Sequence, residues 1–183
     1  MIKTISFFLG FVLGLSVLGC NMDKKVKEDF EKFSVDKNLP QNDTIRLLSK
    51  YPEIKLFSNE KIKSKTRTAY IFQHAGILPM DNYKCSMTLK NDTLEILLNN
   101  NNSYFGNGIF IKVFEKNFLI NDIDPKTLHS EIKFIKTKPL HQKLVLNKDS
   151  FEKNDSIYGF IDYKTKVDSF NKTFRGYFKA LIQ

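Results

Sequence analysis

The sequence contains few of the residues from which catalytic and metal sites are usually built. It has three histidines, two cysteines and no tryptophan in 183 residues. His74, His129 and His141 lie far apart and form no closely spaced zinc motif. The Gly-x-Ser-x-Gly turn of hydrolases, the glycine-rich phosphate loop and the dinucleotide fingerprint are all missing. The sequence therefore predicts no catalytic constellation, no metal site and no cofactor.

Arginine is also scarce, although the chain is basic. The formal net charge is +9, from 29 Lys and Arg against 20 Asp and Glu, yet the only arginines are Arg46, Arg67 and Arg175. Excess positive charge favours anionic surfaces such as lipid headgroups or envelope polymers. Proteins that read nucleic acid specifically favour arginine, whose planar fork binds phosphates and bases bidentately. We therefore expect no nucleic-acid partner.

Long apolar runs are absent after the first twenty residues. Ile5 to Leu18 carries no charge and follows a single cation, Lys3. A basic start followed by a short apolar core is typical of a secretory signal peptide. A retained transmembrane helix needs about 20 apolar residues, and Gly10, Gly14 and Gly19 weaken this stretch as a helix. Residues 1–19 are therefore predicted to be an export signal.

The end of this run carries the clearest motif of the chain. Val17-Leu18-Gly19-Cys20 resembles the lipobox of bacterial lipoproteins. The resemblance implies cleavage between Gly19 and Cys20 and a diacylglycerol on the Cys20 thiol, which anchors the protein to a membrane of the cell envelope. A diacylated cysteine meets the two-chain condition for stable anchoring. In such lipoproteins, Asp after the cysteine commonly favours retention in the inner membrane, so Asn21 at that position implies the outer membrane in a cell that has two membranes.

Three segments follow from this motif. Residues 1–19 are the signal, residues 20–42 a lipidated N-terminus and lysine-rich tether, and residues 43–183 a β-rich domain. The stretch from Asp43 to Pro52 suits a short helix capped by Asp43 and stopped by Pro52, or else a strand.

The clearest secondary structure is a β-hairpin in the middle of the chain. Apolar residues alternate with polar ones from Tyr83 to Lys90, the pattern of a half-buried strand. Asn91-Asp92 then offers a two-residue turn that tolerates positive φ. The register would pair Lys90 with Thr93, Leu89 with Leu94, Met87 with Ile96, Cys85 with Leu98, Thr88 with Glu95 and Lys84 with Asn99. Cys85 should therefore point inward, with no disulfide, because lipid occupies Cys20.

About eight or nine short strands, separated by turn signals, predict an all-β antiparallel sandwich. A second hairpin is expected around Glu115-Lys116-Asn117, with a register that is ambiguous by one residue. Residues 143–161 resemble immunoglobulin-like modules, in which a strand, a bend and a second strand follow one another. A lipocalin-like barrel is the alternative, although that family usually carries a tryptophan near its first strand.

Several residues are candidates for function. In the polar stretch 99–108, a ligand-binding loop would use Asn101, Asn102, Tyr104 and Phe105. A metal-assisted hydrolase would use Asp122, Asp124 and Glu131. An Asn-Asp-Ser/Thr-aliphatic pattern, which is either turn chemistry or resembles a bacterial O-glycosylation signal, recurs at Thr44, Thr93 and Ser156.

The sequence thus favours a non-enzymatic, lipid-anchored β-module that binds or protects an envelope component, with an envelope protein or glycan as partner. A metal-assisted envelope hydrolase and a toxin-immunity or protease-inhibitor lipoprotein are the alternatives.

Overall fold

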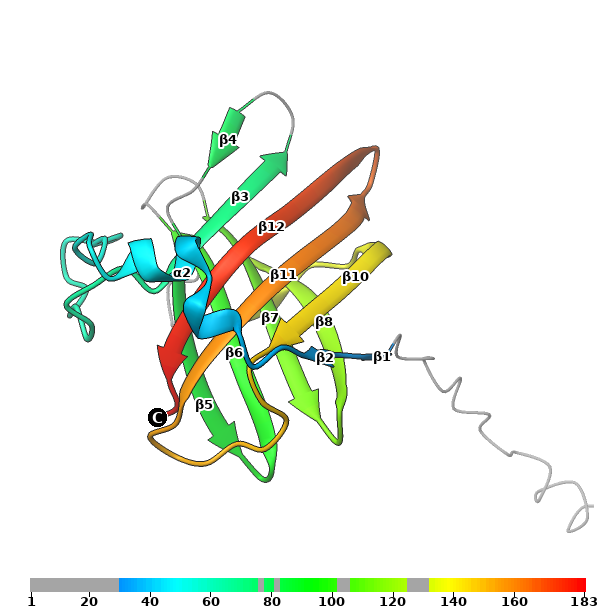
Figure 1. The fold of residues 1–183 in the computed structure, drawn as a ribbon. Helices are drawn as coiled ribbons and strands as arrows, with labels where there is room; N and C mark the ends of the chain where they lie inside the picture. Colours follow the sequence, from blue (N-terminus) through cyan, green and yellow to red (C-terminus); the bar gives the residue numbers. More distant parts are fainter. Residues whose placement is uncertain (1–29, 76–77, 81–82, 102–105, 125–131) are drawn as a thin grey trace, which may run out of the picture.

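Two antiparallel sheets face each other in the computed structural model (Figure 1), which describes residues 30–75, 78–80, 83–101, 106–124 and 132–183. The first sheet has the order β1-β8-β7-β6-β5, with β9 also beside β8. Its strands are β1 (Glu31–Lys32), β5 (Lys84–Lys90), β6 (Thr93–Asn101), β7 (Gly106–Phe114), β8 (Asn117–Asp124) and β9 (Lys133–Phe134).

The second sheet has the order β2-β10-β11-β12-β3-β4. Its strands are β2 (Ser34–Val35), β3 (Ala69–Ala75), β4 (Leu78–Met80), β10 (Lys138–Leu146), β11 (Ser156–Val167) and β12 (Phe170–Leu181). All pairs are antiparallel except β2 with β10. The two sheets do not close into a barrel, so the predicted sandwich is confirmed over the barrel alternative. Eight strands, β3, β5–β8 and β10–β12, have seven or more residues.

The predicted central hairpin is confirmed residue by residue. Lys90 pairs with Thr93 and Lys84 with Asn99, with every pair between them in the expected register. Asn91 and Asp92 have φ of 46° and 61°, the left-handed conformation that a tight hairpin turn requires. Cys85 is buried and forms no disulfide.

The second hairpin has a register that the sequence left ambiguous. Phe114 pairs with Asn117, so the turn is Glu115-Lys116, with φ of 46° and 66°. This register points Phe118 and Ile120 into the core. Burial of those two side chains, rather than the chemistry of the turn, therefore accounts for the register.

The core lies between the two sheets and is mainly aliphatic and aromatic. Alternate residues of each long strand point into it, which is the period of two expected for half-buried strands. Its largest fully buried side chains include Tyr83, Tyr163, Phe118, Phe174 and Phe178. The same alternation separates the two faces of β12, where Phe174 and Phe178 are buried while Arg175 is exposed.

Part of the segment predicted as tether belongs to the folded domain. β1 pairs with β8, β2 pairs with β10, and Phe33 between them is buried. A 3-10 turn η1 (Leu39–Gln41) and a helix α2 (Asp43–Leu48) follow. The domain thus extends N-terminally of residue 43, to β1 at Glu31. These residues join the fold because Phe33 and Leu39 find apolar partners in the sandwich, which outweigh the surrounding charges.

The short helix expected near residue 43 is present but is capped differently. Asn42, not Asp43, is the N-cap, and its side chain accepts hydrogen bonds from the amides of Thr44 and Ile45. The helix ends at Leu48 rather than at Pro52. Pro52 instead forms an isolated bridge with Thr66.

Candidate functional site

The predicted ligand loop is shorter than expected. β6 continues to Asn101 and β7 begins at Gly106, and the two residues pair. Asn101 is buried, with only 6% of its surface exposed, so it faces no open ligand site. Asn102, Tyr104 and Phe105 lie outside the described residues.

Asp122, the first of the predicted acidic residues, belongs to a buried polar network between the sheets. Its carboxylate accepts hydrogen bonds from the Tyr163 hydroxyl (2.7 Å) and the Thr137 hydroxyl (3.0 Å). The Lys172 ammonium lies 3.1 Å from the other carboxylate oxygen, with both side chains almost fully buried. Burial and the neighbouring carboxylate raise the pKa of the Tyr163 hydroxyl well above its usual range. Both oxygens of Asp122 are thus engaged within the protein.

Only one of the other two acidic candidates falls in the described part of the chain. Asp124 lies two residues further along β8 and is partly exposed, and Glu131 lies outside the described residues. Within the described ranges, no group of three His, Cys, Asp or Glu side chains is placed to hold a metal ion.

Lys172 and Tyr163 were missed by the sequence analysis, although a signal for both exists. The alternation that buries Phe174 and Phe178 predicts an inward Lys172 when it is extended by two residues. The pattern of β11 likewise buries Tyr163. A buried lysine needs a counter-charge, and the partner of Lys172 is Asp122 of the opposite sheet, which the sequence around Lys172 does not reveal.

The recurring Asn-Asp-Ser/Thr pattern performs local turn chemistry in all three places. Asn42 caps α2, Asn91-Asp92 forms the central turn, and Asn154 adopts a φ of 73° before β11. At the third copy, the Asp155 carboxylate bonds Lys148 and accepts from the Glu152 amide at 2.8 Å. Turn geometry therefore accounts for the pattern, and glycosylation of these residues stays a prediction.

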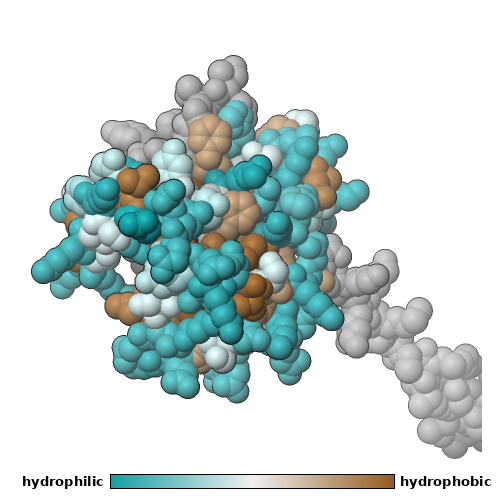
Figure 2. Space-filling model, in the orientation of Figure 1, coloured by the Kyte–Doolittle hydropathy of each residue, from teal (hydrophilic) through white to brown (hydrophobic). Residues whose placement is uncertain are grey.

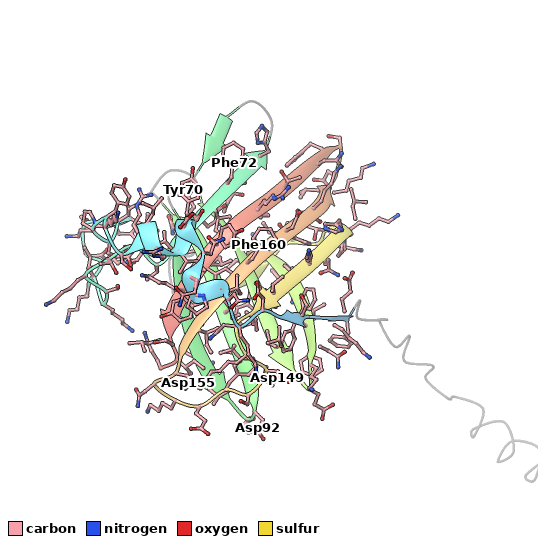
Figure 3. All side chains as sticks on the ribbon, in the orientation of Figure 1. Tyr70, Phe72, Asp92, Asp149, Asp155 and Phe160 are labelled. Atoms are coloured by element: carbon pink, nitrogen blue, oxygen red, sulfur yellow. The ribbon has the colours of Figure 1, made fainter. Side chains whose placement is uncertain are left out.

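The solvent-facing side of the second sheet carries a group of aromatic side chains that no local sequence motif predicted. Cross-strand pairing aligns Tyr70 of β3 with Tyr177 of β12, and Tyr177 with Phe160 of β11. The rings of Phe160 and Tyr177 lie 4.9 Å apart. Phe72, two residues along β3, points to the same side, and Tyr70 and Phe72 are each 42% exposed. We call these four side chains the aromatic face; Figure 3 labels Tyr70, Phe72 and Phe160 among them.

Positive charge surrounds the aromatic face. Arg175 pairs with Phe72 across the strands, and its guanidinium lies 5.9 Å from the centroid of the Phe160 ring. Asp162 of β11 pairs with Arg175, and its carboxylate lies 3.8 Å from the Arg175 Nε. On the other side of β11, Lys143 of β10 pairs with Asp162. Lys164 lies two residues further along β11 and points to the same side. Three cations therefore face one carboxylate in this part of the sheet, and Figure 2 shows the hydrophobic areas of this side interspersed with hydrophilic ones.

The segment from η1 to α2 borders the aromatic face. Figure 1 shows α2 lying in front of the second sheet, and Figure 3 labels Tyr70, Phe72 and Phe160 of the aromatic face in the same orientation. The Lys179 ammonium of β12 donates to the Ser49 hydroxyl just after α2 (2.6 Å). Ile45 and Leu48 of α2 are buried, so their apolar surface is used within the fold. The aromatic rings beside the helix remain partly open to solvent.

A hollow lies under the segment 51–67, which we call the 51–67 loop. It has a volume of about 760 Å³ and is bounded by this loop, the start of β5 and the ends of β11 and β12. Glu53, on the loop, is buried, and burial raises the pKa of its carboxyl group although nearby Lys84 opposes the shift. Cys85 also lines the hollow, and burial raises the pKa of its thiol well above the usual range. Such a thiol is a poor nucleophile.

Among the described residues, no helix is both long and apolar enough to cross a membrane. Comparison with protein-family models, curated proteins and solved structures finds no match to this chain.

Proposed function

We propose that this chain is a lipid-anchored binding module of the bacterial cell envelope, whose aromatic face binds an anionic glycan. The alignment of Tyr70, Tyr177 and Phe160 across three neighbouring strands, on the solvent side of the sheet, carries this proposal. Aromatic side chains that stay exposed are typical of a recognition surface.

The composition of the surface supports a flat, sugar-like ligand. Planar rings offer apolar area at low entropic cost, and the C–H faces of sugar rings pack against them. Neighbouring strands lie about 4.8 Å apart, so successive rings follow one another at a spacing close to the size of one sugar ring. A polymer lying across the strands would therefore contact several rings at once.

The charge of the surface supports an anionic ligand. Arg175, Lys143 and Lys164 point outward from consecutive strands, with Asp162 as the opposing charge among them. A basic surface attracts anionic polymers, and this attraction weakens as the salt concentration rises. In the envelope, the lipid at Cys20 would hold this surface close to its ligand and raise the local concentration.

The proposal is tested with the full chain, purified in detergent, and with polygalacturonate as an acidic probe and dextran as a neutral one. Calorimetric titration should give binding to polygalacturonate that weakens as salt rises. Phe72→Ser and Arg175→Gln should each weaken it by about tenfold, which corresponds to about 1.4 kcal/mol. Phe134→Ser is the matched control, because Phe134 is 54% exposed but lies on β9 of the other sheet.

Two results would contradict the proposal. Equal binding of dextran and polygalacturonate would remove the role of charge, and equal weakening by Phe134→Ser would remove the role of this face. Unfolding midpoints of each variant separate loss of binding from loss of fold.

A further inference from the structure

Two buried oxygen atoms that line the hollow under the 51–67 loop lack a hydrogen-bond partner. They are Oε2 of Glu53 and Oδ1 of Asn99; both residues line the hollow, both atoms are closed to solvent, and no described group of the protein donates to either. Glu53 is 92% buried, since only 8% of its surface is exposed. Buried polar atoms in proteins are almost always paired. Two unpaired acceptors on residues that line one hollow therefore point to a ligand that brings its own donors.

The surrounding side chains restrict the kind of ligand. Thr68 donates to the other Glu53 oxygen (3.4 Å) and accepts from the Cys85 amide (3.0 Å), which fixes the carboxylate against β5. Lys84 is paired with Glu60 at 2.9 Å. Lys179 also lines the hollow; loss of solvent lowers the pKa of its ammonium group, which also donates to the Ser49 hydroxyl. The residues around the hollow thus include both hydrogen-bond acceptors and ammonium donors.

These groups exclude most charged ligands on chemical grounds. A fully ionised phosphate or carboxylate group accepts hydrogen bonds but has no hydrogen to donate to Glu53 and Asn99. A cationic ligand would face the lysines that line the hollow, which outnumber its two glutamates. A hydroxyl group both donates and accepts, so it suits the acceptors and the ammonium groups together. Apolar atoms of Cys85, Ile157 and Ile182 complete the lining and suit the C–H face of a sugar.

We propose that the hollow under the 51–67 loop binds a small neutral saccharide, whose hydroxyls donate to Glu53 and Asn99. Its volume of about 760 Å³ lies within the range of pockets for small ligands. The loop is closed at its base by the Pro52–Thr66 bridge and by the Arg67 amide, which donates to the Tyr51 carbonyl (3.0 Å). Sugar entry requires movement of this loop, because Glu53 Oε2 is not open to solvent. The site is separate from the aromatic face and does not depend on its function.

The test uses the full chain in micelles of a detergent without a sugar headgroup. Galactose, mannose, N-acetylglucosamine and maltose serve as neutral probes, and glucuronate and glucosamine as charged ones. Saturation-transfer NMR should detect binding of at least one neutral probe. Glu53→Gln and Asn99→Ala should each weaken that binding by about tenfold, while Glu115→Gln, in an exposed turn, should leave it unchanged.

Three outcomes would overturn the assignment. The first is that no neutral probe binds at high millimolar concentration. The second is that a charged probe binds more tightly than the neutral ones. The third is that binding is unchanged in both Glu53→Gln and Asn99→Ala. Neutral-probe binding that is lost in Phe72→Ser but kept in Glu53→Gln would locate the sugar on the aromatic face instead. Polygalacturonate binding is measured on the same variants, so failure of this site and failure of the aromatic face are told apart.

Discussion

At the scale of single residues, the interior of this sandwich holds a charged pair among apolar side chains. Lys172 comes from β12 and Asp122 from β8, so the pair joins the two sheets. Tyr163 and Thr137 satisfy the remaining carboxylate positions. The Lys172 ammonium also lies 4.8 Å from the centroid of the Phe174 ring. A buried pair with this many partners favours one arrangement of the sheets over others.

Lys172→Met should destabilise the fold by about 3–5 kcal/mol, because it leaves the Asp122 carboxylate buried without its counter-charge. Urea unfolding of the variant measures this change. The double variant Lys172→Met/Asp122→Leu should recover part of the loss, since no charge then stays buried. Lys164→Met, at an exposed position of β11, is the control. A single variant as stable as the wild type would show that the pair does not hold the sheets together.

Glu53 should make stability depend on pH in the sense opposite to a salt-bridged acid. Its folded pKa is raised by burial, so the folded state binds the proton more tightly than the unfolded state does. The fold is therefore favoured at low pH and loses stability as pH rises from the ordinary glutamate pKa of 4.5 through the raised folded value. The melting temperature of the wild type should fall relative to that of Glu53→Gln as pH rises across this range.

The control for this titration is Glu115→Gln, which changes a glutamate in an exposed turn. Its melting temperature should follow that of the wild type at every pH. A wild-type curve parallel to that of Glu53→Gln across the whole range would mean that the carboxyl group does not titrate differently in the fold.

At the scale of elements, the long β11–β12 hairpin depends on two glycines at close contacts. A Cβ at Gly159 would lie 2.1 Å from the ring of Phe178, its cross-strand partner. A Cβ at Gly176 would lie 2.0 Å from the carbonyl oxygen of Tyr70 on β3. The first contact is with a ring that is fully buried, and the second is with backbone of the neighbouring strand. Both glycines are therefore required by packing.

Gly159→Ala should destabilise the protein by about 1–3 kcal/mol, because the buried Phe178 ring has to shift. Gly176→Ala should cost more, since the backbone of β3 has to move away from β12. Lys164→Ala, outward on β11, should change stability by less than about 0.5 kcal/mol. Urea unfolding orders the three variants, and a Gly176→Ala protein no less stable than Gly159→Ala would contradict the argument.

At the scale of the whole molecule, the folded domain starts close to the proposed anchor. Nine residues, Asn21 to Asp29, separate Cys20 from the first described residue, Phe30. A chain of that length spans at most about 30 Å when fully extended. A lipid on Cys20 would therefore keep the sandwich within a short distance of the membrane. β1 pairs with β8, and the Phe33 amide donates to the Lys116 carbonyl in the β7–β8 turn (3.2 Å), so the described chain enters the fold beside this turn.

Cys20→Ala should release the protein from the membrane fraction without changing its fold. The thiol of Cys20 is the proposed site of the diacylglycerol, and two acyl chains are enough for stable anchoring. Fractionation after cell disruption and incorporation of a labelled fatty acid measure the change, with Cys85→Ala as the control for the second thiol. A Cys20→Ala protein that stays in membranes and still carries the label would refute the anchor.

The sequence by itself determined the elements that depend on neighbours along the chain. The 84–99 hairpin was predicted to the residue, because alternation sets the face of each strand and Asn91-Asp92 sets the turn. The sandwich class followed from the same period of two. Twelve strands are described where about eight or nine were expected, because β1, β2, β4 and β9 have only two or three residues each and carry no alternation of their own. The capping of α2 was one residue off, since Asn42 and Asp43 are both good caps and only the geometry of the turn separates them.

The tertiary structure decided what depends on residues far apart in the chain. β12 pairs with β3 across about a hundred residues of sequence, and this pairing alone aligns Tyr70 with Tyr177. The Lys172–Asp122 pair and the hollow at Glu53 likewise join segments from different parts of the chain. Local patterns set which way a side chain points, but its partner is chosen when the sheets pack. A buried charge such as Lys172 needs its counter-charge, and an aligned aromatic ring needs its cross-strand neighbour. In both cases the partner comes from a distant part of the chain, which the neighbouring sequence does not specify.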